Sequence, residues 1–263
     1  MPDWTSYDTA ATSHDQIAAP LIFAPPARDL AELGNVGPGM MVLDVGTGSG
    51  IAAVAASERG ARMVVGVDRS EGMLRQARRH GVICAAAALP GLPFADEPFD
   101  RVLASFVLSH VASYRLALAD IVRVVRRGGK VAATAWGAMP CAPRDFWDSL
   151  AHRRAGRERL RAALEEALPW EDWLMDAAHL REAFEEAGLA AVEVHRKIYE
   201  VRLTIADFLA MRENSMQARF MRQTLDAAEW EAFKGDLTRE FHAKFSDPVD
   251  HPRDVLIATG VRP

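Results

Sequence analysis

Between residues 40 and 137, short apolar runs alternate with stretches of helical periodicity. The pattern predicts buried strands over Met41–Val45, Arg62–Val67, Val82–Cys84, Asp100–Ser105 and Lys130–Trp136, and helices between them over Ile51–Arg59, Glu71–His80 and Leu116–Arg126. Strands rich in Val, Ile and Leu that alternate with helices are typical of a parallel sheet covered on both faces. The core of the chain is therefore predicted to have an α/β fold.

The flanking segments have other patterns. Residues 1–39 are rich in proline, and we expect two short helices there, His14–Phe23 and Ala27–Leu33. Residues 138–190 are charged and have helical periodicity. Two further strands are predicted late in the chain, and residues 204–250 form a helical insertion between them. These late strands are expected over Ala191–Leu203 and Val255–Val261.

Composition narrows the range of functions. The 263 residues are 49% hydrophobic and 25% charged, which is ordinary for a globular protein. The formal net charge of −5 disfavours a nucleic-acid partner, because phosphate binding relies on clustered Lys and Arg. No apolar run approaches the ~20 residues that span a bilayer, so no membrane partner is expected, and residues 1–14 lack a secretory signal. Only Cys84 and Cys141 occur, so we expect reduced thiols and a cytoplasmic location; the oligomeric state stays open.

The segment VLDVGTGSG, residues 42–50, is the most informative motif. Gly46, Gly48 and Gly50 allow a sharp turn and the close approach of a ligand at the carboxyl end of a strand, where open parallel sheets bind ligands. The spacing G-x-G-x-G differs from the dinucleotide-binding G-x-G-x-x-G. Asp44 would repel a pyrophosphate but could bind an ammonium group. The motif therefore favours a ligand that carries an amino acid, and a nicotinamide-dependent oxidoreductase becomes the weaker alternative.

Asp68 ends the second predicted strand, in VVGVD. A carboxylate at this place can accept hydrogen bonds from both hydroxyls of a ribose, as the acid after the second strand does in nucleoside-cofactor folds. The alternative is that Asp68 only helps to cap the helix that follows. The preceding glycine turn favours the ribose interpretation.

Four stretches together resemble the class I S-adenosylmethionine-dependent methyltransferases. They are VLDVGTGSG (42–50), VVGVDRSEGML (64–74), LPGLPFADEPFDRVLASFVLSHV (89–111) and ALADIVRVVRRGGKVAATAWG (117–137). The resemblance is to the small-molecule branch that includes the ubiquinone and menaquinone biosynthesis methyltransferases, and it covers the central part of the chain. It implies one Rossmann-like domain over residues 1–263. Its sheet would have seven mostly parallel strands with an antiparallel last strand, helices on both faces and a helical lid.

The resemblance also implies how the cofactor S-adenosylmethionine is held by the core, residues 40–137. Asp44 and the turn from Gly46 to Gly50, with Thr47 inside it, would hold the methionine part. Ser105 and Phe106, at the end of the fourth strand, would form the floor beneath it.

The ribose and adenine contacts follow in the same way. The resemblance gives the ribose hydroxyls to Asp68 and places Arg69 and Met73 beside the adenine. The family often has an acid where this chain has Ala88. The backbone amide of Leu89 is then left to bind the ring.

Methyl transfer from a sulfonium depends mainly on positioning, and a general base helps when the acceptor atom is a hydroxyl oxygen or an acidic carbon. His110 is the candidate base, because the ordinary pKa of histidine, near 6.5, suits neutral pH. The alternative is a structural histidine bonded to a backbone carbonyl. No metal site is predicted, because the eight histidines are scattered.

The flanks are expected to cover the site. Residues 1–39 would form helices over the cofactor, with Tyr7 as a lid residue. Residues 204–250 would form the lid and the substrate wall, with Phe208, Met211 and Phe220 at the acceptor or simply packing the lid helices.

The predicted function is methyl transfer from S-adenosylmethionine to O, N or C of a small, apolar or aromatic molecule. The alternative is a protein of the same fold that does not methylate. Such a protein would bind the nucleoside as a regulator or use the sulfonium charge to catalyse a rearrangement.

Overall fold

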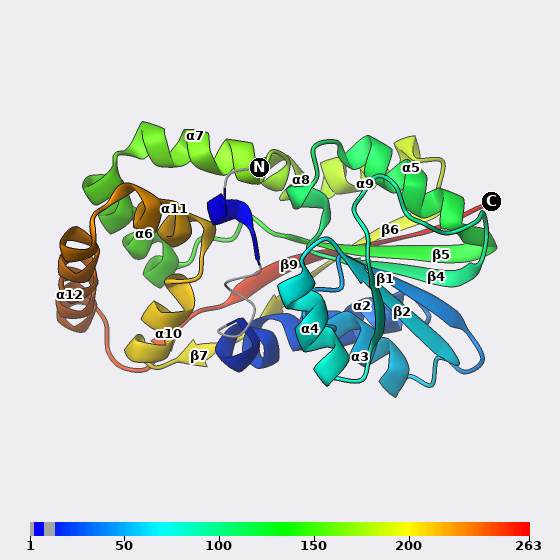
Figure 1. Cartoon of the computed structure of the whole chain (residues 1–263), viewed down its shortest axis with the longest axis horizontal. Coiled ribbons are helices and arrows are strands. Elements are labelled where there is room, and N and C mark those ends of the chain that lie inside the picture. Colours follow the sequence, from blue (N-terminus) through cyan, green and yellow to red (C-terminus); the bar gives the residue numbers. More distant parts are fainter. Residues whose placement is uncertain (1–2, 8–13) are drawn as a thin grey trace.

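A seven-stranded sheet forms the core of the protein, on the right in Figure 1. In this computed structural model, which describes residues 3–7 and 14–263, the strand order is β3-β2-β1-β4-β5-β9-β6. β9 is antiparallel to β5 and β6, and the other neighbouring strands are parallel. The predicted Rossmann-like sheet with an antiparallel last strand is thus confirmed. Its strands are β1 (Met41–Val45), β2 (Met63–Asp68), β3 (Ile83–Ala86), β4 (Phe99–Ser105), β5 (Val125–Trp136), β6 (Ala190–Tyr199) and β9 (Arg253–Val261).

Helices cover both faces of this sheet, as Figure 1 shows. Side chains alternate between the faces along each strand, so Leu43 and Val102 pack under α5 and α9, whereas Val42 and Leu103 pack under α2 and α3. Burial on both faces explains why these strands are continuous apolar runs in the sequence. The covering helices are α2 (Ala24–Leu33), α3 (Ile51–Glu58), α4 (Glu71–Arg79), α5 (Tyr114–Val124) and α9 (Ala177–Glu186).

A helical lid lies beyond one end of the sheet, on the left in Figure 1. Trp147 of α6, together with Phe208 of α10 and Phe241 of α12, belongs to one buried apolar cluster in this lid. The segment after β5 and the insertion before β9 therefore build the lid together, rather than the insertion alone. Its helices are α6 (Ala142–Ala155), α7 (Arg157–Ala167), α10 (Ile205–Arg212), α11 (Met216–Thr224) and α12 (Ala227–Lys244).

The strand predicted over Ala191–Leu203 is divided in two. Its first part is β6, whereas β7 (Arg202–Leu203) leaves the main sheet and pairs with β8 (Val249–Asp250). This short pair brings together the two points where the chain enters and leaves the lid insertion.

The N-terminal segment reaches across the sheet and the lid. η1 (Asp3–Thr5) packs beside the lid, and the π-helix η2 (His14–Phe23) runs directly into α2, which carries Pro25 and Pro26 in its first turn. Residues 1–2 and 8–13 of the predicted covering segment lie outside the described residues.

No helix in the described ranges has the length and apolar character needed to cross a bilayer. The remaining short helices are η3 (Leu108–His110) and α8 (Glu171–Leu174).

Truncating Phe241 tests the shared lid core. The side chain is fully buried and packs on Phe208, with ring centroids 5.3 Å apart. We expect Phe241→Ala to lower the free energy of unfolding by about 3–5 kcal/mol, measured by chemical denaturation, because it removes a large buried ring and leaves a cavity. Leu116→Ala, at a side chain that is 60% exposed, is the control and should change it far less. Equal losses would contradict the shared core.

Candidate functional site

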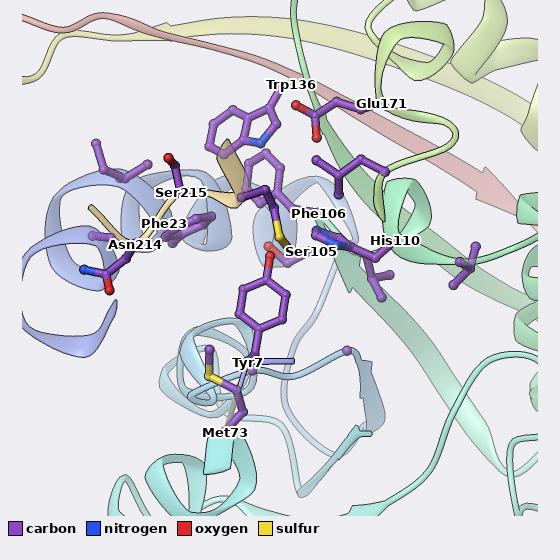
Figure 2. A pocket seen from close by; sticks show the side chains of 18 of the residues that line it. Tyr7, Phe23, Met73, Ser105, Phe106, His110, Trp136, Glu171, Asn214 and Ser215 are labelled. Carbon is purple, nitrogen blue, oxygen red and sulfur yellow. The ribbon is translucent and has the colours of Figure 1, made fainter. Parts of the chain in front are cut away.

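A cavity of about 880 Å³ lies between the carboxyl ends of the parallel strands and the lid. Ligand pockets commonly measure about 300–1,000 Å³, so this one is near the upper limit and has room for two small molecules. The ends of β1, β2, β4 and β5 form its floor, and Tyr7, α8 and the junction of α10 with α11 form its cover. In Figure 2 the Tyr7 hydroxyl points toward the middle of the cavity, with Met73 on one side and Phe106 and Trp136 on the other.

The glycine turn after β1 forms one end of the floor. Gly46 and Gly48 line the cavity and have φ angles of 65° and 55°, which favour glycine. A Cβ on Gly46 would lie 2.4 Å from the Val107 side chain, so this glycine allows the turn to pack on the loop after β4. A Cβ on Gly48 would meet no atom within 4 Å. The open space at Gly48 is where a ligand can approach the backbone.

Asp68 joins the glycine turn to the end of β2. Its carboxylate accepts a hydrogen bond from the Gly48 amide at 2.9 Å and another from the Ser70 amide at 2.9 Å. Burial raises the pKa of Asp68, although these amides and Arg69 favour the charged form. A carboxylate offers about four lone-pair sites, so Asp68 keeps acceptor capacity toward the cavity that it lines.

Asp44, near the end of β1, stabilises the glycine turn that follows it. It is fully buried, and its Oδ2 accepts a hydrogen bond from the Thr47 hydroxyl at 2.6 Å. Burial raises the pKa of Asp44 to about 7, against the effect of Thr47 and the Ala53 amide. Asp44, Thr47 and Gly50 do not belong to the cavity lining. The contact of Asp44 with a ligand ammonium group therefore stays a prediction, and the observed role of this residue is to shape the turn.

The other residues predicted around the cofactor line the same cavity. They are Arg69, Met73, Ala88, Leu89, Ser105 and Phe106. Met73 is placed by the Ser70 hydroxyl, which accepts a hydrogen bond from its amide and caps α4. The Phe106 amide donates a hydrogen bond to Thr134 on the neighbouring strand at 2.9 Å, which fixes the end of β4.

His110 lies next to Tyr7 in the wall of the cavity, as Figure 2 shows. Their ring centroids are 5.6 Å apart, at an interplanar angle of 75°. Burial, with the positive charges of Arg69 and Arg219, lowers the pKa of His110 to about 4, so the ring is neutral at neutral pH. Its buried Nδ1 has no hydrogen-bond partner in the described part of the chain. No described backbone carbonyl bonds to that nitrogen, and the base and the structural interpretation of His110 both stay predictions.

Two aromatic rings and a guanidinium group form a stack at the ends of three neighbouring strands. Phe106, after β4, stacks on Trp136 of β5 with centroids 4.0 Å apart, and the Arg253 guanidinium of β9 lies 3.9 Å from the Trp136 ring centroid. Phe23 closes the row from the side, 5.5 Å from Phe106 and 5.8 Å from Trp136. This row connects the strand ends near the glycine turn with the far end of the cavity.

The far end of the cavity is charged, and no motif in the sequence predicts this. Arg144, Arg212 and Arg253 line it together with Asp148 and Glu171. These side chains come from α6, α8, α10 and β9, so no local motif joins them. The only available signal was a group of charged residues beside apolar helix positions, which is also what a solvated helix face looks like.

The predicted substrate wall is only partly in place. Tyr7 and Met211 line the cavity, but Phe208 and Phe220 do not. Phe208 is packed inside the lid, and Phe220 packs on Trp4 with centroids 5.4 Å apart. These two phenylalanines hold the N-terminal segment and the lid helices together, which is the alternative that the sequence left open.

Cys84 and Cys141 are free thiols. Among residues 3–7 and 14–263, no group of His, Cys, Asp and Glu is arranged to hold a metal ion.

Comparison with known proteins identifies the central segment. Residues 43–133 match the family model of a methyltransferase domain. Demethylmenaquinone methyltransferase of Thermobifida fusca is 39% identical over 114 residues, which are 41% of this chain and 48% of that relative. The same enzyme of Mycobacterium sp. (strain KMS) is 41% identical over 97 residues, 37% of this chain and 42% of the relative. The chain thus spans less than half the length of these curated relatives.

Solved structures resemble the whole fold. Phosphoethanolamine N-methyltransferase 2 of Haemonchus contortus, in complex with S-adenosyl-L-methionine, has a TM-score of 0.58 at 19% identity, over 100% of this chain and 60% of that one. The YcgJ protein of Bacillus subtilis has a TM-score of 0.56 at 16% identity, over 90% of this chain and 98% of that one. At such low identity the likeness establishes the fold alone.

The low pKa of His110 predicts a pH-dependent stability. The unfolded chain binds the imidazole proton near pH 6.5 and the folded chain only near pH 4. The free energy of unfolding should therefore fall as the pH drops from about 6.5 to 4, by up to about 3 kcal/mol from this residue. His110→Gln should remove this part of the slope in urea titrations at several pH values, leaving the part due to the buried His251. An unchanged slope in His110→Gln would contradict the assignment.

Proposed function

We propose that this protein, which carries a class I methyltransferase domain in its centre, binds S-adenosylmethionine and transfers the methyl group to O, N or C of a small molecule. The observation that carries the proposal is the pairing of Asp68 with the Gly48 amide at the mouth of the glycine turn, inside a cavity large enough for cofactor and acceptor. The domain match over residues 43–133 supports it. The substrates of the relatives do not define the acceptor of this chain.

The residues of the cavity fit the cofactor. The space at Gly48 is open, and Asp68 keeps acceptor sites for the ribose hydroxyls. Arg69 and Met73 would flank the adenine, the Leu89 amide beside Ala88 would bind its edge, and Ser105 and Phe106 would lie under the methionine part. Met73 suits a place at an aromatic ring because its sulfur is polarizable.

When bound, S-adenosylmethionine supplies a methyl group that its sulfonium has already activated. The chain then has to exclude water and orient the acceptor, which alone can contribute several kcal/mol. Tyr7 covers the middle of the cavity, and burial raises its pKa to about 12, so its hydroxyl stays protonated and can donate a hydrogen bond. His110 is neutral, and its Nδ1, which has no partner among the described residues, offers the acceptor a hydrogen-bonding group next to Tyr7.

The acceptor site combines two kinds of surface. Phe106, Trp136 and Met211 provide apolar and aromatic area, which supports the proposed aromatic or apolar acceptor. The arginines at the lid end add a polar anchor. Free thiols at Cys84 and Cys141 agree with the proposed cytoplasmic location.

Asp68→Asn tests the cofactor site. Losing charged hydrogen bonds, each worth about 1.5–3 kcal/mol, should weaken S-adenosylhomocysteine and S-adenosylmethionine about 10- to 150-fold in calorimetric titration. The exposed Asp236→Asn is the matched control and should bind as the wild type does, and NADH should not bind. Unchanged affinity in Asp68→Asn would contradict the ribose assignment. Binding of NADH alone would favour the oxidoreductase.

His110→Gln separates catalysis from binding. If His110 accepts a proton from the acceptor, turnover with [methyl-³H]S-adenosylmethionine and a panel of small phenols, amines and acidic carbon compounds should fall about 10²- to 10⁴-fold. The affinity for S-adenosylhomocysteine should stay the same, because the substituted ring lies outside the proposed ribose and adenine contacts. Retained turnover would show that His110 only shapes the wall. Tight cofactor binding with no transfer to any acceptor would favour the regulator or rearrangement alternative.

A further inference from the structure

Three arginines meet at the lid end of the cavity. Arg144 lies in the first turn of α6, Arg212 in the last turn of α10, and Arg253 is the first residue of β9. We call these three residues the arginine cluster. All of them line the cavity and all lie outside residues 43–133, the part that matches the methyltransferase domain.

Arg212 is held in a fixed orientation. Its side chain is 12% exposed, and it forms an ion pair of 2.7 Å with Asp148. The guanidinium lies 4.4 Å from the centroid of the Trp147 ring, and its buried Nε has no hydrogen-bond partner within residues 3–7 and 14–263. Trp147 and Asp148 thus fix the plane of this group and leave one donor unused.

Arg253 is the least compensated member of the cluster. It stacks on Trp136, and its Nη1 lies 3.4 Å from His251 Nε2. Its buried Nε has no partner, and no carboxylate of the described chain lies within 4 Å of its guanidinium. Burial and the charges of Arg144 and Arg212 lower the pKa of Arg253 to about 10, so it remains charged at neutral pH. A partly buried charge with no carboxylate in contact is unfavourable, and a bound anion would relieve this.

The acidic residues nearby limit the charge that can bind. Asp148 is used by Arg212, and Asp145, which is half exposed, pairs with Arg144 at 3.2 Å. Glu171 and Asp172 also line the cavity; burial and Asp172 raise the pKa of Glu171, whereas Arg253 and the other two arginines favour its charged form. A dianion such as a phosphate would meet more repulsion from these carboxylates than a monoanion. A single negative charge matches the one arginine of the cluster that has no carboxylate within 4 Å among the described residues.

We propose that the arginine cluster binds a carboxylate of the methyl acceptor, so that the acceptor is an aromatic or apolar molecule with one carboxylate group. Guanidinium forks match carboxylates in geometry, and three guanidinium side chains line this end of the cavity. The stack of Phe106, Trp136 and Arg253 places aromatic side chains of the cavity lining directly beside the charge. That the bound molecule is the methyl acceptor rests on the proposed function, whereas the carboxylate site itself does not.

The test compares benzoate with benzamide, which has nearly the same shape but no charge. Both are titrated calorimetrically into the full-length protein, with and without saturating S-adenosylhomocysteine. We expect the wild type to bind benzoate at least about tenfold more tightly than benzamide. Arg253→Gln should abolish this preference, and Arg253→Lys should restore part of it because it returns the charge without the planar fork.

Controls make each outcome decisive. Arg239→Gln, at an exposed arginine of α12, keeps the same change in net charge and should retain the benzoate preference. Should Arg253→Gln fail to fold, Arg144→Gln, at a side chain that is 25% exposed, takes its place. Equal binding of benzoate and benzamide to the wild type would overturn the proposal, as would loss of the preference in Arg239→Gln.

The titrations also separate this proposal from the proposed function. If the wild type does not bind S-adenosylhomocysteine but still prefers benzoate, the methyltransferase assignment fails and the carboxylate site stands. If Arg253→Gln weakens S-adenosylhomocysteine instead of benzoate, the cluster holds the carboxylate of the cofactor and the proposal is overturned.

Discussion

The hydrogen bond from the Gly48 amide to the Asp68 carboxylate, 2.9 Å long, joins the two strand ends on which the site depends. The same carboxylate accepts a hydrogen bond from the Ser70 amide. The Ser70 hydroxyl in turn accepts one from the Met73 amide and so caps α4. One partly buried carboxylate therefore connects the glycine turn, β2 and the helix that follows. Because an acceptor shielded from water must keep its donors, a shift of one of these elements would cost hydrogen bonds to the others.

The sequence predicted the core well because the physics there is local. Strands buried on both faces have continuous apolar runs in the sequence. The positive φ angles of the turn require glycine, as Gly46 and Gly48 show. Asp68 could be found because it directly follows such a run. The contact between Asp44 and Thr47 was harder to foresee, because a carboxylate beside a glycine turn can face the ligand or the turn itself.

The lid and the charged end of the cavity could not be predicted in the same way. Phe208 and Phe220 are residue types that often line an apolar substrate pocket. In the folded protein, Phe208 instead packs in the lid core and Phe220 packs on Trp4 of the N-terminal segment. Arg144, Arg212 and Arg253 lie in α6, α10 and β9, and only the packing of both lid segments in one cluster brings them together. The periodicity of a single sequence does not show which residues of distant elements lie close together in space.

The lid and the sheet contribute to the arginine cluster in unequal ways. Arg253 belongs to β9, which lies between β5 and β6 and is paired on both sides, whereas Arg144 and Arg212 belong to the lid helices. An anion shared by them would link the central sheet to the lid. Occupancy of the cavity and the position of the lid would then be a single equilibrium, so a neutral molecule of the same shape would fill the space without drawing the lid onto the sheet.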